Sequence, residues 1–246
     1  MVVRARHAAR GQHFLRSSAL AAELVRAAGV RPGDLVLDLG AGTGVFTRAL
    51  ARAGAHVVAV ELDPVFARGL RVSFEVVEDD ILRVPLPREP FRVVANLPFA
   101  CTTAALRRLL DPRIPLLSAD VIVQWGFAVK RTAVWPSTRL SVEWGAWHEL
   151  SLVRRLPRCC FAPPPSVDCA LLRVTRRNEP LVPPDERGNY RRFVERGFRD
   201  GLRALVPPRR LKRLADELGF ARTAAPRDLD ASQWATLYRR AVRPTG

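Results

Sequence analysis

The tetrapeptide Asn96-Leu97-Pro98-Phe99 combines two hydrogen-bond acceptors with an aromatic ring. Proline has no N–H and fixes φ, so the side-chain oxygen of Asn96 and the carbonyl of Leu97 can be held as convergent acceptors. Two acceptors beside the Phe99 ring suit an amino group on a flat base, which they bind through its N–H protons. A structural turn around a buried phenylalanine has the same local sequence, so the assignment depends on its place in the fold.

A second candidate site is the glycine-rich segment Asp38-Leu39-Gly40-Ala41-Gly42-Thr43-Gly44. Glycine accepts positive φ and lets a ligand approach the backbone. Glu61 follows the next aliphatic run, 17 residues beyond Gly44, where a carboxylate can accept both hydroxyls of a ribose. The spacing G-x-G-x-G, opened by an acidic residue, favours the cationic S-adenosylmethionine over a dinucleotide, although an ordinary glycine-rich connection remains the alternative.

Two further segments could contact a nucleoside. After a third predicted strand, Asp79 or Asp80 can accept a hydrogen bond from the exocyclic amine of adenine, and Ile81 can cover its ring; a solvated acidic turn is the alternative. The proline-rich loop 161–168 could aim Phe161 at a base, or could simply connect two strands rigidly. The four cysteines and four histidines lack the spacing of a zinc site, so we expect no metal.

The elements that must position these residues alternate between strands and helices. Short aliphatic runs predict strands near residues 35–37, 57–60, 74–77, 91–95, 121–124 and 170–174, with helical periodicity between most of them. From Arg176 onward the pattern predicts helices only, near residues 187–205, 208–218 and 232–242. We therefore predict an α/β catalytic domain over residues 1–176 and a small helical domain over residues 177–246.

The charge of the chain points to a polyanionic partner. The chain has 40 Lys and Arg and 24 Asp and Glu, which gives a net charge of +16, and only two of the 40 basic residues are lysine. Residues 176–246 carry 17 basic and nine acidic residues, so the predicted helical domain is the more densely charged part. Arginine pairs bidentately with phosphate, which favours nucleic acid. A codon bias would explain arginine over lysine but not the missing acidic balance.

Neither a secretory signal nor a membrane span is predicted. The first ten residues contain three arginines and no apolar stretch, and no uninterrupted apolar run approaches ~18 residues. We expect a cytoplasmic monomer.

Taken in order, six segments of the chain resemble the motifs of the ribosomal RNA adenine-N6 dimethyltransferases. These segments are Gln12-His13-Phe14-Leu15, Asp38 to Gly44, Glu61, Asp80-Ile81, Asn96 to Phe99 and Phe161 to Val167. The chain looks most like the Erm branch, which modifies one adenine of 23S rRNA and so blocks macrolide, lincosamide and streptogramin B binding. The resemblance implies a Rossmann-like class I methyltransferase fold with a mostly parallel seven-stranded sheet and an all-α C-terminal domain that binds RNA.

The resemblance also implies roles for individual residues. The S-adenosyl-L-methionine co-substrate would be bound by Gln12, His13, Leu15, Gly40, Gly42, Glu61, Asp80, Ile81 and Asn96. The target adenine would be received by Asn96, Leu97, Pro98 and Phe99, with Phe99 and Phe161 stacking on it. Two positions depart from the family pattern: His13 stands where asparagine is usual, and Phe99 lacks a common tyrosine hydroxyl.

Two alternatives stay open. The KsgA-type 16S rRNA adenine dimethyltransferases share all these motifs, although the short C-terminal domain and the stretch Gln124 to Ala128 favour the Erm branch. A non-catalytic nucleic-acid-binding factor on a methyltransferase fold is the alternative from another class, and the intact Asn96-Leu97-Pro98-Phe99 argues against it. A small-molecule methyltransferase would not need the basic tail.

Overall fold

The computed structural model describes residues 12–242. The first ten residues, considered above for a secretory signal, lie outside this range. Two compact units make up the chain: the first runs to Ala128 and includes Ser151–Thr175, and the second combines Val129–Leu150 with the residues from Arg176 onward. No helix within residues 12–242 is long and apolar enough to cross a membrane.

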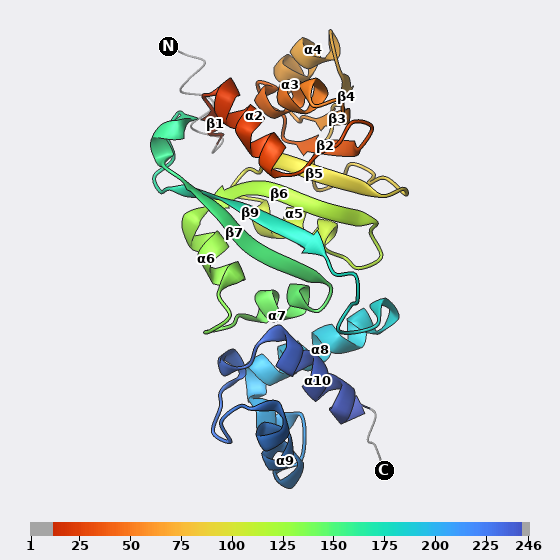
Figure 1. Cartoon of the computed structure of the whole chain (residues 1–246), viewed down its shortest axis with the longest axis vertical. Helices are drawn as coiled ribbons and strands as arrows, with labels where there is room; N and C mark the ends of the chain where they lie inside the picture. The colour runs from red at the N-terminus through yellow and green to blue at the C-terminus, as the bar shows by residue number, and fades with distance from the viewer. Residues whose placement is uncertain (1–11, 243–246) are drawn as a thin grey trace. The chain divides into compact units, whose positions relative to one another are not determined.

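Seven strands form one sheet in the order β4-β3-β2-β5-β6-β9-β7 (Figure 1). Strands β4, β3, β2, β5 and β6 pair in parallel, and β9 runs antiparallel to β6. The mostly parallel seven-stranded sheet implied by the resemblance is therefore confirmed. The strands are β2 (Leu35–Leu39), β3 (His56–Val60), β4 (Glu75–Val77), β5 (Phe91–Asn96), β6 (Leu116–Gln124), β7 (His148–Leu156) and β9 (Cys169–Arg176).

Helices connect these strands as the alternating pattern predicted. They are α2 (Ser18–Ala27), α3 (Val45–Arg52), α4 (Pro64–Arg71), α5 (Thr102–Leu109) and α6 (Trp125–Thr132). Local chemistry sets their starts: the Ser17 side chain accepts from Leu20 N at 3.1 Å, and Asp63 accepts from Val65 N at 2.9 Å. Buried aliphatic residues of α2, α3 and the sheet form the core of the first unit.

A second, two-stranded sheet was not predicted. β1 (Phe14–Leu15) pairs antiparallel with β8 (Phe161–Ala162), which follows the short 3-10 helix η1 (Arg158–Cys160). Two-residue strands are too short to show periodicity, so the sequence indicated only loops here. The pairing fixes the segment before α2 against the proline-rich loop, nearly 150 residues away.

The second unit is helical. It contains α7 (Arg139–Gly145), α8 (Arg187–Asp200), α9 (Pro208–Leu218) and α10 (Ala231–Val242), with 3-10 turns η2 (Pro184–Glu186), η3 (Leu202–Ala204) and η4 (Pro226–Asp228). Its core combines aliphatic side chains with large aromatic ones, of which Tyr190, Trp234 and Tyr238 are at most 1% exposed. Helix α7 was not predicted, although its N-cap Thr138 forms a capping box with Ser141.

Candidate active site

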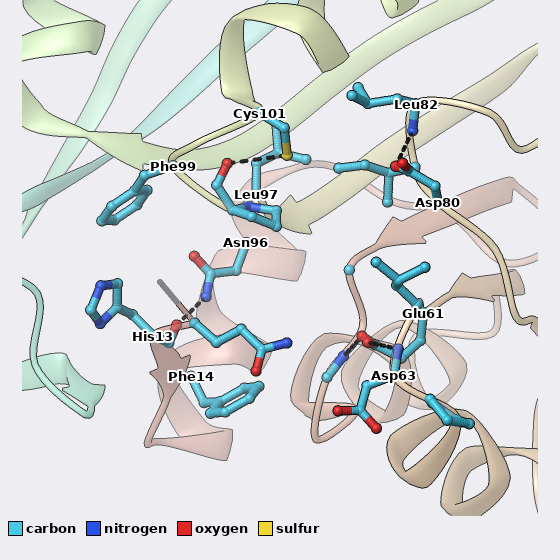
Figure 2. Close-up of a pocket in the computed structure, with 17 residues that line it drawn as sticks. His13, Phe14, Glu61, Asp63, Asp80, Leu82, Asn96, Leu97, Phe99 and Cys101 are labelled. Carbon is cyan, nitrogen blue, oxygen red and sulfur yellow. Dashed lines mark hydrogen bonds between the residues drawn. The ribbon is translucent and has the colours of Figure 1, made fainter. Parts of the chain in front are cut away.

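A cavity of about 610 Å³ lies where the carboxyl ends of β2, β3, β4 and β5 meet (Figure 2). Parallel strands bring the residues that follow them to one edge of the sheet, and ligand sites form there. The volume is within the range of small-molecule sites. The cavity is lined by Gln12, His13, Phe14, Gly40, Gly42, Glu61, Leu62, Asp63, Pro64, Asp80, Ile81, Leu82, Asn96, Leu97, Pro98, Phe99 and Cys101.

The glycine turn between β2 and α3 needs its glycines. Gly40 and Gly42 have φ values of 76° and 53°, a region that other residues rarely adopt. A Cβ on Gly42 would also lie 2.5 Å from the ring of Phe14. The turn therefore keeps bare backbone facing the cavity, with the Phe14 ring packed directly against it.

Glu61 holds this turn from the end of β3. The side chain is 3% exposed; its Oε2 accepts from Gly42 N at 2.7 Å and its Oε1 accepts from Asp63 N at 2.8 Å. A carboxylate oxygen has two lone-pair sites, so each can accept a further bond from a ligand. Glu61 thus stabilises the glycine turn through its hydrogen bonds and is also a candidate acceptor for ribose hydroxyls.

Asp38 does not face the cavity. It is 1% exposed on β2, and the Thr47 hydroxyl donates to its Oδ2 at 2.6 Å. Burial raises the pKa of this carboxyl to about 7, against the lowering effect of Thr47, and nearby Glu61 raises it further. The interpretation of Asp38 as an acidic group beside a cationic ligand is therefore wrong, because its carboxyl packs beneath α3.

The orientation of the Asn96 amide follows from one hydrogen bond. Its Nδ2 donates to the His13 carbonyl at 2.6 Å (Figure 2). Because a carbonyl can only accept, the nitrogen must face His13, and Oδ1 is the atom left to accept from a ligand. Within residues 12–242 the Asn96 side chain makes no other hydrogen bond.

The imidazole of His13 contacts the Pro163 carbonyl and the Phe99 ring. Its Nδ1 lies 2.9 Å from the Pro163 carbonyl, and its ring centroid lies 5.4 Å from that of Phe99 at an interplanar angle of 34°. The Phe99 and His13 side chains lie toward the same end of the cavity (Figure 2). The ring therefore connects the proline-rich loop to the aromatic end of the cavity.

Of the two candidate aspartates after β4, Asp80 lines the cavity. Its Oδ1 accepts from Leu82 N at 2.8 Å, whereas Asp79 uses its Oδ1 to accept from Asp80 N at 2.7 Å. Ile81, next in the chain, also lines the cavity and is 8% exposed. The geometry favours Asp80 as the acceptor and gives Asp79 a supporting part.

Two predicted site residues do not line the cavity. Leu15 and Phe161 are 5% and 1% exposed, face each other across the β1–β8 pair and belong to the core of the first unit. Stacking of Phe161 on a base stays a prediction and requires its ring to leave this core. Reasoning from the sequence missed six lining residues that directly neighbour predicted ones or follow the same strand ends: Phe14, Leu62, Asp63, Pro64, Leu82 and Cys101.

Residues 12–242 contain no group of three or more His, Cys, Asp or Glu that could hold a metal ion. The four cysteines are free thiols.

The sheet order, the glycine turn after β2 and the asparagine at the end of β5 define a Rossmann-like methyltransferase. The ribosomal RNA adenine dimethylase family matches residues 4–206. The chain belongs to this family of S-adenosylmethionine-dependent enzymes.

Relatives of this chain include one antibiotic-resistance protein and an rRNA methyltransferase. The mycinamicin-resistance protein MyrB of Micromonospora griseorubida is 38% identical over 93% of this chain and 77% of its own length. An rRNA adenine N-6-methyltransferase of Streptomyces fradiae is 35% identical over 95% of this chain and 77% of its own.

The fold of this chain is similar to solved structures of RNA methyltransferases. The crystal structure of the 23S rRNA methyltransferase ErmE has a TM-score of 0.82 and 31% identity, covering 94% of this chain and all of that one. A dimethyladenosine transferase of Plasmodium falciparum shares the fold at 22% identity, with a TM-score of 0.73 over 92% of this chain and 96% of its own. The protein is an rRNA adenine N6-methyltransferase of the Erm type.

Proposed function

We propose that this protein transfers methyl groups from S-adenosylmethionine to N6 of one adenine in 23S rRNA and so confers resistance to macrolides, lincosamides and streptogramin B. The observation that carries the proposal is the Asn96 amide, whose Nδ2 is held by His13 so that Oδ1 remains to accept. The names of MyrB and ErmE support the resistance function and the 23S target.

The cavity fits the co-substrate. The bare turn at Gly40 and Gly42 admits a ligand against the backbone, Glu61 offers lone pairs to a ribose, and Asp80 with Ile81 suits the amine and face of an adenine. S-adenosylmethionine supplies an electrophilic methyl group on a sulfonium sulfur. Further lining contacts would come from Gln12, His13 and Asn96, whereas buried Leu15 acts only through packing.

The other end of the cavity suits the target adenine. Asn96 Oδ1 and the Leu97 carbonyl would accept the two N6 protons, which favours a pyramidal, more nucleophilic nitrogen. Pro98 stiffens the segment, and Phe99 would stack on the base and stabilise positive charge on it. Because N6 attacks through its lone pair and releases a proton to solvent only after the methyl group has left sulfur, no general base is needed before transfer. Orientation of nitrogen, methyl and sulfur in line can supply ~7 to 11 kcal/mol. The adenine must leave its stack to enter.

An rRNA substrate supports a cytoplasmic location. We propose that the protein acts as a monomer. The basic residues 177–246 would hold the RNA through its phosphates.

The test is transfer of labelled methyl groups to purified, unmodified 23S and 16S rRNA, offered separately. Label in 23S adenine supports the proposal. Label only in 16S rRNA would assign the protein to the KsgA type, and label in neither would favour a binding factor.

Asn96→Ala isolates the proposed role of the amide. We expect a loss of transfer of about 100-fold or more, the typical cost of removing one preorganised transition-state hydrogen bond, with RNA affinity nearly unchanged. Asn178→Ala, at an exposed asparagine outside the cavity, is the matched control. Unchanged transfer by Asn96→Ala would remove Asn96 from the mechanism.

A further inference from the structure

Among the described residues of the second unit, one aromatic side chain is exposed. Trp135 is 61% exposed and its neighbour Val134 is 53% exposed. The chain has five tryptophans, and the other four are buried or half-buried in the structure. Tryptophan is enriched at binding interfaces, because a partner that covers its large ring removes much apolar surface from water.

The loop that carries Trp135 is held in place on both sides. At its base, Arg131 Nη1 donates to the Thr138 hydroxyl, which joins the end of α6 to the start of α7. Ser137 N donates to the Arg227 carbonyl of η4 at 2.7 Å. A loop fixed in this way presents its ring with little ordering entropy left to lose on binding.

A cavity of about 280 Å³ adjoins this loop. Ala133, Val134 and Ser137, on either side of Trp135 in the chain, line it together with residues of α7, β7 and α10. The Ser137 hydroxyl and His148 Nδ1, in residues 6% and 1% exposed, are buried without a hydrogen-bond partner in the described chain. Buried polar atoms are nearly always paired, so these two indicate a polar occupant.

The occupant is polar but not strongly charged. Burial lowers the pKa of His148 to about 4; the nearby Arg176 and Arg177 act in the same direction and the Trp144 backbone acts against them, so the ring is neutral. Both arginines that line the cavity have partners within the protein, because Arg131 donates to the Thr138 hydroxyl and Arg177 pairs with Glu149 at 2.9 Å. Asp230 also lines the wall. Hydroxyl groups or the edge of a base suit this lining better than a phosphate, whose charge Asp230 would oppose.

We propose that Trp135 and this cavity form a second nucleotide site, which binds an unpaired nucleotide of the RNA substrate away from the target adenine. The base stacks on Trp135, and the polar groups of the nucleotide enter the cavity and bond to Ser137 and His148. Lys130, exposed at the end of α6, can meet the phosphate backbone. The identity of the RNA as substrate rests on the proposed function.

A nucleotide fits this surface better than a protein partner. The exposed apolar patch in this loop consists of two neighbouring side chains, whereas a stable protein interface buries about 800 Å² on each partner. Bases of unpaired RNA stack on aromatic side chains, and double-stranded RNA does not expose its bases for this contact. Single-stranded RNA should therefore bind where a duplex does not.

Tryptophan fluorescence of the full chain tests the site directly. A short single-stranded oligoadenylate should quench the emission of the wild type, and an RNA duplex of mixed sequence should not. Trp135→Phe should lose the quenching and keep the affinity, because phenylalanine stacks as well. Trp135→Ala should weaken oligoadenylate binding about tenfold or more, as the loss of one stacked base does. Equal quenching by the duplex, or unchanged affinity of Trp135→Ala, would overturn the proposal.

Ser137→Ala provides the second variant. Removing a buried hydroxyl that has no partner should leave the free energy of unfolding unchanged or raise it, while weakening oligoadenylate binding several-fold. Ser73→Ala, at an exposed serine of the first unit, is the control. A loss of stability in Ser137→Ala with unchanged binding would mean that the hydroxyl has a structural role, against the proposal.

The outcomes of these experiments distinguish a failure of the second nucleotide site from a failure of the proposed function. Methyl transfer by the wild type with unchanged binding by Trp135→Ala would refute the second site alone. Quenching at Trp135 without transfer to either rRNA would refute the proposed function and leave an RNA-binding site.

Discussion

Replacing Asp38 by asparagine should change how the stability of this protein depends on pH. The Asp38 carboxyl is fully enclosed beneath α3, where burial raises its pKa from 3.8 to about 7. The Thr47 hydroxyl donates to it at 2.6 Å but does not offset the loss of hydration. The native state therefore holds a proton on Asp38 at pH values where the unfolded chain has lost it.

The direction and size of the effect follow from this difference. A pKa raised on folding stabilises the native state through proton binding, fully below about pH 4, and this contribution is lost as the pH rises through 7. A shift of about three units corresponds to about 4 kcal/mol in total, of which about 3 kcal/mol falls between pH 5 and pH 8. Asparagine does not titrate, so the variant lacks this loss.

Urea unfolding of both proteins at intervals from pH 5 to pH 8 measures the effect. We expect the free energy of unfolding of Asp38→Asn, relative to the wild type, to rise by about 3 kcal/mol from the lower to the higher pH. The variant can also be less stable than the wild type by the same amount at every pH, because the asparagine NH₂ needs a new acceptor; the test is the change in this difference with pH. Asp185→Asn, at an exposed position, should run parallel to the wild type. Parallel curves for Asp38→Asn as well would refute the reasoning.

Gly42→Ala should strongly reduce S-adenosylmethionine affinity in a calorimetric titration, because the new Cβ would collide with the Phe14 ring and alanine would have to adopt a positive φ. The control is Gly29→Ala, where φ is also positive but the space around the Cβ is open. It should lose only about 1 kcal/mol of stability and keep the affinity. His148→Gln should remove an acid sensitivity of the second unit. The His148 pKa is lowered by burial to about 4, so wild-type stability falls as the pH drops below about 6.5, by about 2 kcal/mol at pH 5. Urea unfolding at pH 7 and pH 5 checks this, and an equal loss in the variant would contradict it. Because His148 and Asp38 act in opposite directions, only the variants separate them.

Much of the fold could be predicted because its signals are local. Helix α9 occupies the predicted residues 208–218, where Pro208 starts the helix and Gly219, at φ 71°, ends it. The positions of the strands also allowed the site to be predicted. Asn96 ends β5 and Glu61 follows β3, so a parallel sheet had to bring them to the same edge. The family resemblance, which uses the same motifs, was confirmed.

The rest of the site depends on contacts between distant residues. The carbonyl of His13 orients Asn96, 83 residues away, and the His13 ring reaches Pro163, 150 residues away. No local pattern encodes such pairs, and two-residue strands such as β1 and β8 carry no periodic signal.

The sequence by itself determined the class of fold, the family and the set of strand ends that carry the chemistry, because turn geometry and hydrophobic periodicity are local properties. Only the tertiary structure decided which polar groups face a ligand. It buried Asp38 and Phe161, directed Asp80 into the cavity and left Trp135 exposed. Burial is a property of all the segments that pack around a residue, and residues of the same type can therefore lie in the core or at the surface.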